Sequence, residues 1–433
     1  MMVSYGQRGV FARLAGLAAT GLLVACGAPE TAEQVTDHEP VAEEQAPSAA
    51  APILALTNAR IFDGDSETLI DNGVVLIQNG RILDVGTMDS LDLPPEADVQ
   101  DLMGRYLLPG FINAHGHVNP TGDRSSISEQ LDIYAHYGVT TVLSLGDGGT
   151  HMDGDRWSPD LSTARLFVAG PSLNPDSPEA AESEVARVDE MGVDWVKVHV
   201  MPGRGEHFAA VIEAAEVRGL PVAIHIETLA DAKAVLAADA ALLGHSVRDE
   251  PVDNELIDMM RTQGVCLTPT LTRELSTFIY AERPDFFDDP FFIERSAPDD
   301  LDAFLTSERR EQAQSEQAQY WRDALPLAKE NMVALHEAGA DIAMGTDTGP
   351  TGRFQGYFEH VEMNMMVDAG MSPVDVLISA TGKAADCIGL GDQLGRIAPG
   401  YWADLVVLEE NPLADINHTR TLYGVWTAGN RVR

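Results

Sequence analysis

Six side chains that can bind a metal or move a proton interrupt short apolar runs where a buried strand would otherwise be apolar throughout. The most unusual is Lys197, one of four lysines in the chain, which lies in the run WVKVHV. An unpaired ammonium is costly to bury, and burial lowers the pKa of a lysine. We interpret the six residues as a metal centre: His115, His117, Lys197, His225, His245 and Asp347.

The spacing and chemistry of these residues support this interpretation. His115 and His117 are two residues apart, so on a strand both imidazoles point to the same face and can reach one ion. Imidazole and carboxylate ligands suit zinc or another divalent transition metal. A buried, neutral Lys197 can take up carbon dioxide and become a carbamate, whose two oxygens could bridge two ions.

The surrounding sequence predicts a scaffold that brings these side chains together. Short apolar runs alternate with amphipathic stretches such as 205–219 and 253–264, which is typical of parallel strands joined by helices. Eight strands and their helices predict a TIM (β/α)8 barrel, in which active residues lie at the carboxyl ends of the strands. The eight strands are expected near 110–117, 139–146, 165–170, 195–200, 221–227, 241–246, 265–271 and 341–347.

In order and type, the motifs resemble those of the amidohydrolase superfamily from about residue 52 to the chain end. PGFINAHGHV carries the histidine pair of the first strand, and DWVKVHV carries the lysine of the fourth. PVAIHIE and ALLGHSV carry the histidines of strands five and six, and IAMGTDTG carries the aspartate of strand eight. The pattern is most similar to the branch of Xaa-Pro dipeptidases and related carboxypeptidases.

The resemblance implies a binuclear centre of two divalent ions, with zinc as the expected metal. His115, His117 and Asp347 would hold one ion, and His225 and His245 the other. The carbamylated Lys197 and a hydroxide would bridge the two ions. The hydroxide would attack the scissile carbonyl, while Asp347 would carry its proton to the leaving amine.

The expected reaction is hydrolysis of a carbon–nitrogen amide bond in a small molecule, namely a dipeptide or an N-acyl amino acid. Such substrates end in a carboxylate, so a guanidinium should lie near the metals. Arg248 is the first candidate, followed by Arg204 and Arg353, and His199 is a further candidate for substrate binding. Hydrolysis of a cyclic amide, lactone or phosphotriester by the same centre is the alternative, and a non-catalytic metal-binding lipoprotein is the rival of another class.

The rest of the chain predicts further domains. Residues 52–107 and 391–433 alternate in strand fashion and resemble the two parts of a small β-sandwich, which flank a barrel at 108–390. Turns are expected at Asp63-Gly64 and Asn79-Gly80. An insertion at 273–322, rich in aromatic and acidic residues, is either a lid or a helical excursion packed on the barrel.

The first 26 residues predict export. Arg8 and Arg13 precede an apolar stretch that is too short to span a bilayer, and LVAC ends at Cys26 as in a bacterial lipobox. Cys26 would carry lipid, and residues 27–51 would be a disordered acidic tether. We therefore expect a lipoprotein on the periplasmic side of a membrane, with the outer membrane favoured, or at the cell surface.

Charge and cysteine content limit the partners. The chain has 68 acidic and 28 basic residues and a formal net charge of −40, which argues against nucleic acid binding and leaves the lipid as the expected membrane contact. Cys266 and Cys387 lie in apolar surroundings, where buried free thiols are the default expectation and a disulfide is the open alternative. The sequence leaves a homo-oligomer open.

Overall fold

The computed structural model describes residues 51–118, 126–146, 154–199 and 205–433. Pro52–Arg433 is one compact unit of the chain. The predicted leader with Cys26, the tether up to residue 50, and Arg204 lie outside the described residues. Within the described part of the chain, no helix is both long and apolar enough to cross a bilayer.

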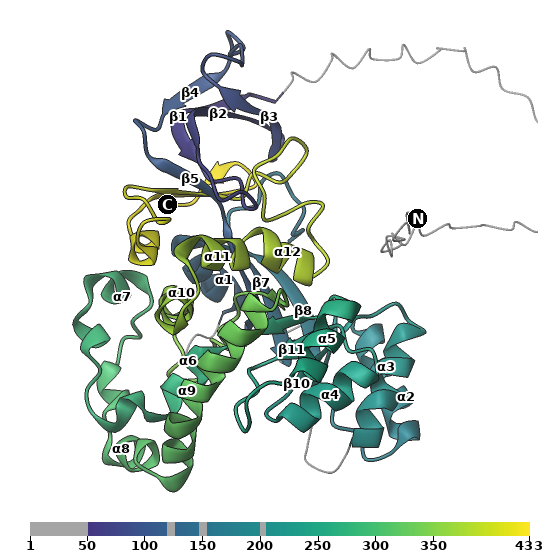
Figure 1. Ribbon diagram of the computed structural model, residues 1–433. Coiled ribbons are helices and arrows are strands. Elements are labelled where there is room, and N and C mark those ends of the chain that lie inside the picture. Colours follow the sequence, from purple (N-terminus) through teal and green to yellow (C-terminus); the bar gives the residue numbers. More distant parts are fainter. Residues whose placement is uncertain (1–50, 119–125, 147–153, 200–204) are drawn as a thin grey trace, which may run out of the picture. The chain divides into compact units, whose positions relative to one another are not determined.

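One eight-stranded sheet is built from both ends of this unit (Figure 1). Its strand order is β16-β15-β14-β5-β1-β2-β3, and β4 pairs with β1. Asn79 and Gly80 both have positive φ and join β2 to β3, as expected for the predicted hairpin turn. The strands are β1 (Leu54–Ile61), β2 (Ile70–Gln78), β3 (Arg81–Thr87), β4 (Asp98–Asp101), β5 (Tyr106–Pro109), β14 (Leu405–Leu408), β15 (Leu422–Thr427) and β16 (Asn430–Arg431).

The middle of the chain is α/β, with two parallel sheets of three and five strands. Their orders are β6-β7-β8 and β13-β12-β11-β10-β9. Every predicted strand has a counterpart here, although most of these strands are shorter than expected. The strands are β6 (Phe111–Gly116), β7 (Val139–Gly146), β8 (Arg165–Pro171), β9 (Val196–His199), β10 (Val222–His225), β11 (Leu242–Gly244), β12 (Cys266–Thr268) and β13 (Asp341–Ile342).

Two predicted site residues that come after these strands have a backbone conformation unlike that of a strand. His245 follows β11 with φ of 75°, and Asp347 has φ of 59°. Both values lie in the left-handed region, which interrupts the strand ladder and is uncommon for residues other than glycine. Sequence periodicity does not carry this information, so the strand predicted at 241–246 runs past the observed end of β11 at Gly244, whereas β13 already ends at Ile342, before Asp347.

Backbone hydrogen bonds also connect the two parallel sheets. Leu173, just after β8, donates to the carbonyl of Lys197 at 2.8 Å and accepts from the amide of His199 at 3.1 Å. On the other side, Ala114 donates to Met344 at 2.9 Å, and His117 donates to Thr348 at 2.8 Å. The segment that follows β13 therefore lies beside β6.

Helices connect most of the parallel strands (Figure 1). The predicted helix at 253–264 has the expected ends, because Asp253 caps it by accepting from the Leu256 amide and Gly264 closes it with φ of 65°. The helices are α1 (Ile127–His136), α2 (Pro178–Glu190), α3 (Gly205–Glu216), α4 (Leu229–Ala237), α5 (Asn254–Gln263), α6 (Leu271–Phe278), α7 (Pro290–Arg295), α8 (Ser307–Ala313), α9 (Glu316–Glu337), α10 (Tyr357–Ala369), α11 (Pro373–Ser379) and α12 (Gly382–Cys387).

The insertion packs on α10 through an aromatic cluster. Phe287 and Phe292 are fully buried and stack at 5.9 Å, and Phe292 also meets Phe354 at 4.9 Å. Tyr357 donates a hydrogen bond to Asp289, with 2.8 Å between the oxygens, and Asp289 also pairs with Arg420. The insertion is thus helical and packs against α10 and the residues before it.

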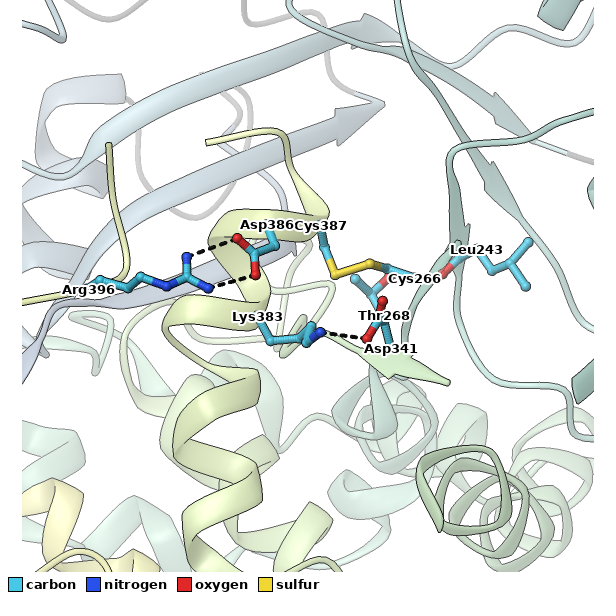
Figure 2. The surroundings of a disulfide bond; sticks show 8 residues. All are labelled: Leu243, Cys266, Thr268, Asp341, Lys383, Asp386, Cys387 and Arg396. Carbon is cyan, nitrogen blue, oxygen red and sulfur yellow. Dashed lines mark hydrogen bonds and ion pairs between the residues drawn. A yellow bond between two sulfur atoms is a disulfide. The ribbon is translucent and has the colours of Figure 1, made fainter. Parts of the chain in front are cut away.

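Cys266 and Cys387 form a disulfide that joins β12 to α12, so the default expectation of free thiols was wrong (Figure 2). Their Cα atoms lie 5.8 Å apart although 121 residues separate them in the sequence. Beside the disulfide, Lys383 of α12 contacts Asp341 of β13 at 2.6 Å. The apolar surroundings of each cysteine were consistent with either state, and only the fold places the two together.

Candidate metal centre

All six predicted ligands come from the carboxyl ends of the parallel strands or from the residues that follow them. Parallel strands bring their carboxyl ends to one edge of a sheet, so residues far apart in sequence converge there. Five of the six are buried, and the side chain of His117 is 15% exposed. They are His115 (β6), His117 (after β6), Lys197 (β9), His225 (β10), His245 (after β11) and Asp347 (after β13).

Three of these residues form a compact group of ligand atoms. Asp347 Oδ1 lies 2.6 Å from His117 Nε2 and 3.5 Å from His115 Nε2. Within the described chain, the ligand atoms of all three residues lie within 4.8 Å of one another. Two imidazoles and a carboxylate are a donor set that suits zinc and similar divalent ions.

The remaining predicted ligands adjoin this group. The Nζ of Lys197 lies 3.4 Å from His115 Nε2. The ring of His245 is centred 4.7 Å from that of His115 and 4.2 Å from that of His225. The structure therefore brings all six side chains into one continuous cluster.

Two threonines that we did not predict orient the histidines. Thr268 Oγ1 lies 3.0 Å from His115 Nδ1, and Thr270 Oγ1 lies 2.6 Å from His245 Nδ1. A partner on Nδ1 leaves Nε2 available to an ion, as is common for histidine ligands. The sequence could have indicated these two threonines. In the run CLTPTLTRE, the seventh strand carries no predicted ligand but has threonines two residues apart at its carboxyl end.

Glu359 is a second group that sequence reasoning missed. Its Oε1 accepts hydrogen bonds from Asn113 at 2.7 Å, from Thr346 at 2.9 Å and from Thr348 at 2.6 Å. Thr346 and Thr348 flank Asp347, so this buried glutamate holds the backbone on both sides of the aspartate. Glu359 lies on α10, and its spacing from the predicted ligands in the sequence does not indicate that it belongs to the site.

Burial shapes the protonation of Lys197 and the histidines. Desolvation lowers the pKa of Lys197 to about 8 and that of His225 to about 3. The pKa of His115 and that of His245 are also lowered, first by burial and then by neighbouring cationic groups. These histidines are therefore neutral near pH 7, the form that binds metals.

Asp347 is held in its charged form. Burial acts to raise the pKa of Asp347, but Arg353 and His117 outweigh burial, so the pKa lies well below its ordinary value. Arg353 forms an ion pair with Oδ2, and the Nε of Arg273 lies 3.9 Å from the same oxygen. A buried carboxylate that is ionised at neutral pH can serve as a ligand and as a proton acceptor.

The predicted substrate-binding residues take different positions. Arg353 lies beside Asp347, whereas Arg248 is 2% exposed, lies 3.5 Å from Glu274 and stacks over Trp321 at 4.9 Å. His199 is exposed, and its ring stacks on His225 at 4.1 Å. We did not single out Arg273 from the sequence, and its Nε lies 3.9 Å from Asp347 Oδ2.

The family model for the amidohydrolase family matches residues 106–432. The chain therefore belongs to the amidohydrolase family, and we class it as a hydrolase of carbon–nitrogen bonds. Members of this family typically use divalent metals, which agrees with the histidine–aspartate group described above.

Curated relatives are distant. The chain is 24% identical over 380 residues to an adenine deaminase of Moorella thermoacetica, covering 83% of this chain and 54% of the deaminase. It is 22% identical over 423 residues to an imidazolonepropionase of Streptomyces avermitilis, covering 84% of this chain and 88% of the relative. The match to the deaminase thus spans little more than half the length of that enzyme.

Solved structures share the fold over most of the chain. A putative prolidase from Bifidobacterium longum superposes with a TM-score of 0.71 and 25% identity, covering 88% of this chain and 95% of the other. A Xaa-Pro dipeptidase with methionine bound in its active site gives a TM-score of 0.68 and 21% identity over 88% and 99% of the two chains.

Proposed function

We propose that the protein hydrolyses the amide bond of dipeptides or N-acyl amino acids. The observation that carries this proposal is the convergence of His115, His117 and Asp347 with a buried lysine. The likeness to a putative prolidase supports the same substrate class. Turnover of a panel of dipeptides and N-acyl amino acids tests the proposal, and failure to hydrolyse any of them with both metals bound would contradict it.

The donor set fits two divalent ions. His115, His117 and Asp347 would hold one, and His245 and His225 the other, with Lys197 as a carbamate between them. When bound, such ions lower the pKa of a coordinated water and polarise the scissile carbonyl. Asp347 would accept the proton of the attacking water and pass it to the leaving amine, since its carboxylate is ionised and buried beside His115 and His117.

We expect close to two divalent ions per chain in active protein, with zinc as the first candidate. Elemental analysis of the purified protein measures this number, and removal of the ions by a chelator should abolish turnover. His245→Ala should lower the metal content. His336→Ala is the matched control because His336 lies on α9 and pairs with Asp375 at 3.5 Å, away from the ligand cluster. One ion or fewer in fully active protein would rule out the binuclear centre.

We also propose that the eight parallel strands close into a barrel, and that the sheet from both chain ends is the small β-sandwich at 52–107 and 391–433. The backbone hydrogen bonds from Leu173 and His199 support continuity between β8 and β9. Those from Ala114 and His117 to the segment after β13 support closure on the other side.

Export as a lipoprotein anchored through Cys26 is our proposal for localisation. The Cys266–Cys387 disulfide supports it, because disulfides persist in oxidising compartments such as the periplasm and are rare in the cytosol. The high negative charge of the chain gives its surface no attraction for an anionic membrane, which supports a lipid as the anchor.

Cys26→Ser should release the enzyme from membranes without loss of specific activity, because the tether carries no other expected anchor. Fractionation of cells followed by activity assays measures the change. Gly27→Ser is the matched control, since it keeps the cysteine and should stay with the membranes. A Cys26→Ser protein that still sediments fully with membranes would contradict the proposal.

A further inference from the structure

A cavity of about 310 Å³ opens beside the candidate metal centre, between the insertion and α9. Three arginines line it, Arg273, Arg309 and Arg353, together with neutral residues that include Trp321, Tyr280 and Thr351. None of the described residues that line it is Asp or Glu. This is unexpected in a chain where acidic residues outnumber basic ones by 68 to 28.

The inner wall of the cavity adjoins the metal ligands. Arg353 forms an ion pair with Asp347, and the Nε of Arg273 lies 3.9 Å from the same carboxylate oxygen. Arg273 stacks over Trp321 at 4.4 Å and contacts Glu274 at 2.9 Å, so its guanidinium is fixed in place. A group bound here lies next to the residues that would act on the amide bond.

The outer wall carries a third cation, which has no acidic partner among the described residues. Arg309 lies on α8 within the insertion, and its guanidinium sits over the ring of Phe304 at 5.4 Å. No salt bridge joins Arg309 to a carboxylate in the part of the chain that the structure describes. It is half-buried, so a bound ligand would shield it further from water.

We propose that this cavity selects substrates whose carboxyl-terminal residue is acidic, with two carboxylates, as in a glutamyl or aspartyl residue. Arg273 and Arg353 would bind the carboxylate next to the scissile amide, and Arg309 would bind the side-chain carboxylate. Guanidinium and carboxylate groups form strong charge-assisted hydrogen bonds, and a ligand with two negative charges offsets the mutual repulsion of three arginines. The volume of the cavity lies in the range typical of small-molecule sites.

This inference rests on the proposed amide hydrolysis and deepens it by naming the substrate class. It assigns the carboxylate-binding role to Arg273 in place of Arg248. Arg248 does not line the cavity, is buried with Glu274, and stacks on Trp321 as Arg273 does. Arg248 therefore supports the cavity wall.

The test compares kcat/KM for N-acetylglutamate and N-acetylglutamine, which differ in charge but hardly in shape. The wild-type protein should prefer the glutamate by about tenfold or more, the gain from one additional ion pair in a partly shielded site. Arg309→Met should bring this ratio close to one. Arg310→Met is the matched control, because Arg310 is exposed on the same helix and does not line the cavity, so the ratio should remain as in the wild type.

Binding of glutarate, measured by calorimetry on the metal-loaded full chain, tests the cavity apart from catalysis. Wild type and Arg310→Met should bind it, and Arg309→Met should bind it about tenfold more weakly. Equal hydrolysis of both substrates, or equal glutarate binding by all three proteins, would overturn the inference while amide hydrolysis still stood. Arg309-dependent glutarate binding without hydrolysis of any amide would instead contradict the proposed function.

Discussion

Replacement of Lys197 by alanine should abolish hydrolysis and lower the metal content of the purified protein. Lys197 is 3% exposed, and its Nζ lies 3.4 Å from His115 Nε2, at the junction of the two groups of ligands. Burial lowers its pKa to about 8, so a substantial fraction of the amine is neutral in mildly alkaline solution. Under our proposal, the neutral amine would attack carbon dioxide, form a nitrogen–carbon bond and release a proton, which would give an anionic carbamate.

The environment of Lys197 leaves little room for another arrangement. A Cβ added at Gly244 would lie 2.8 Å from His115 Cε1 and 3.0 Å from Lys197 Nζ, so both side chains fit closely against the glycine of β11. A side chain held in this way is positioned to act on the ligands rather than to form a surface ion pair. Removing it should leave the two histidine groups without the carbamate that we propose as the link between their ions.

Metal analysis and turnover of Lys197→Ala, with and without bicarbonate and a short carboxylic acid, measure the effect. The added acid should restore part of the activity by replacing the carbamate. Lys233→Ala is the matched control, because Lys233 lies on α4 and pairs with Asp253 and Glu255 at 2.6 Å each. Normal metal content and turnover in Lys197→Ala would show that the bridging role is wrong, and circular dichroism separates loss of the site from loss of the fold.

The sequence was sufficient to predict the positions of the eight parallel strands and of the residues at their ends. Apolar runs are the signature of buried strands, and a histidine or lysine within such a run is costly unless it has a function. The convergence of His115 with Asp347, 232 residues later, followed from the rule that active residues lie at carboxyl ends of parallel strands.

Other features depend on tertiary contacts that no local pattern encodes. The pairing of Cys266 with Cys387 requires β12 and α12 to be neighbours, and the two cysteines are 121 residues apart. Arg248 and Arg273 both follow strands and look alike in sequence, yet only Arg273 lines the cavity. The difference arises from the insertion, whose packing against α10 no periodicity could predict.

Asp347→Asn should reduce turnover by roughly 10²–10⁴-fold, the range expected for loss of a positioned general base. The carboxylate lies 2.6 Å from His117 Nε2 and pairs with Arg353, and it is ionised because these neighbours outweigh the effect of burial on its pKa. An amide of the same shape can neither take a proton from the attacking water nor return one to the leaving amine. Its oxygen can still ligate weakly, so metal loss should be partial.

Turnover, metal content and affinity for a substrate-like inhibitor, measured on the same Asp347→Asn preparation, separate these effects. Inhibitor affinity should fall much less than turnover, because Arg273 and the remaining ligands still hold the bound molecule. Asp341→Asn is the matched control. Asp341 lies on β13, the strand that precedes Asp347, and it contacts Lys383 at 2.6 Å beside the disulfide. Near-normal turnover with both metals retained in Asp347→Asn would show that another residue carries the proton, whereas loss of both metals would make the aspartate chiefly a ligand.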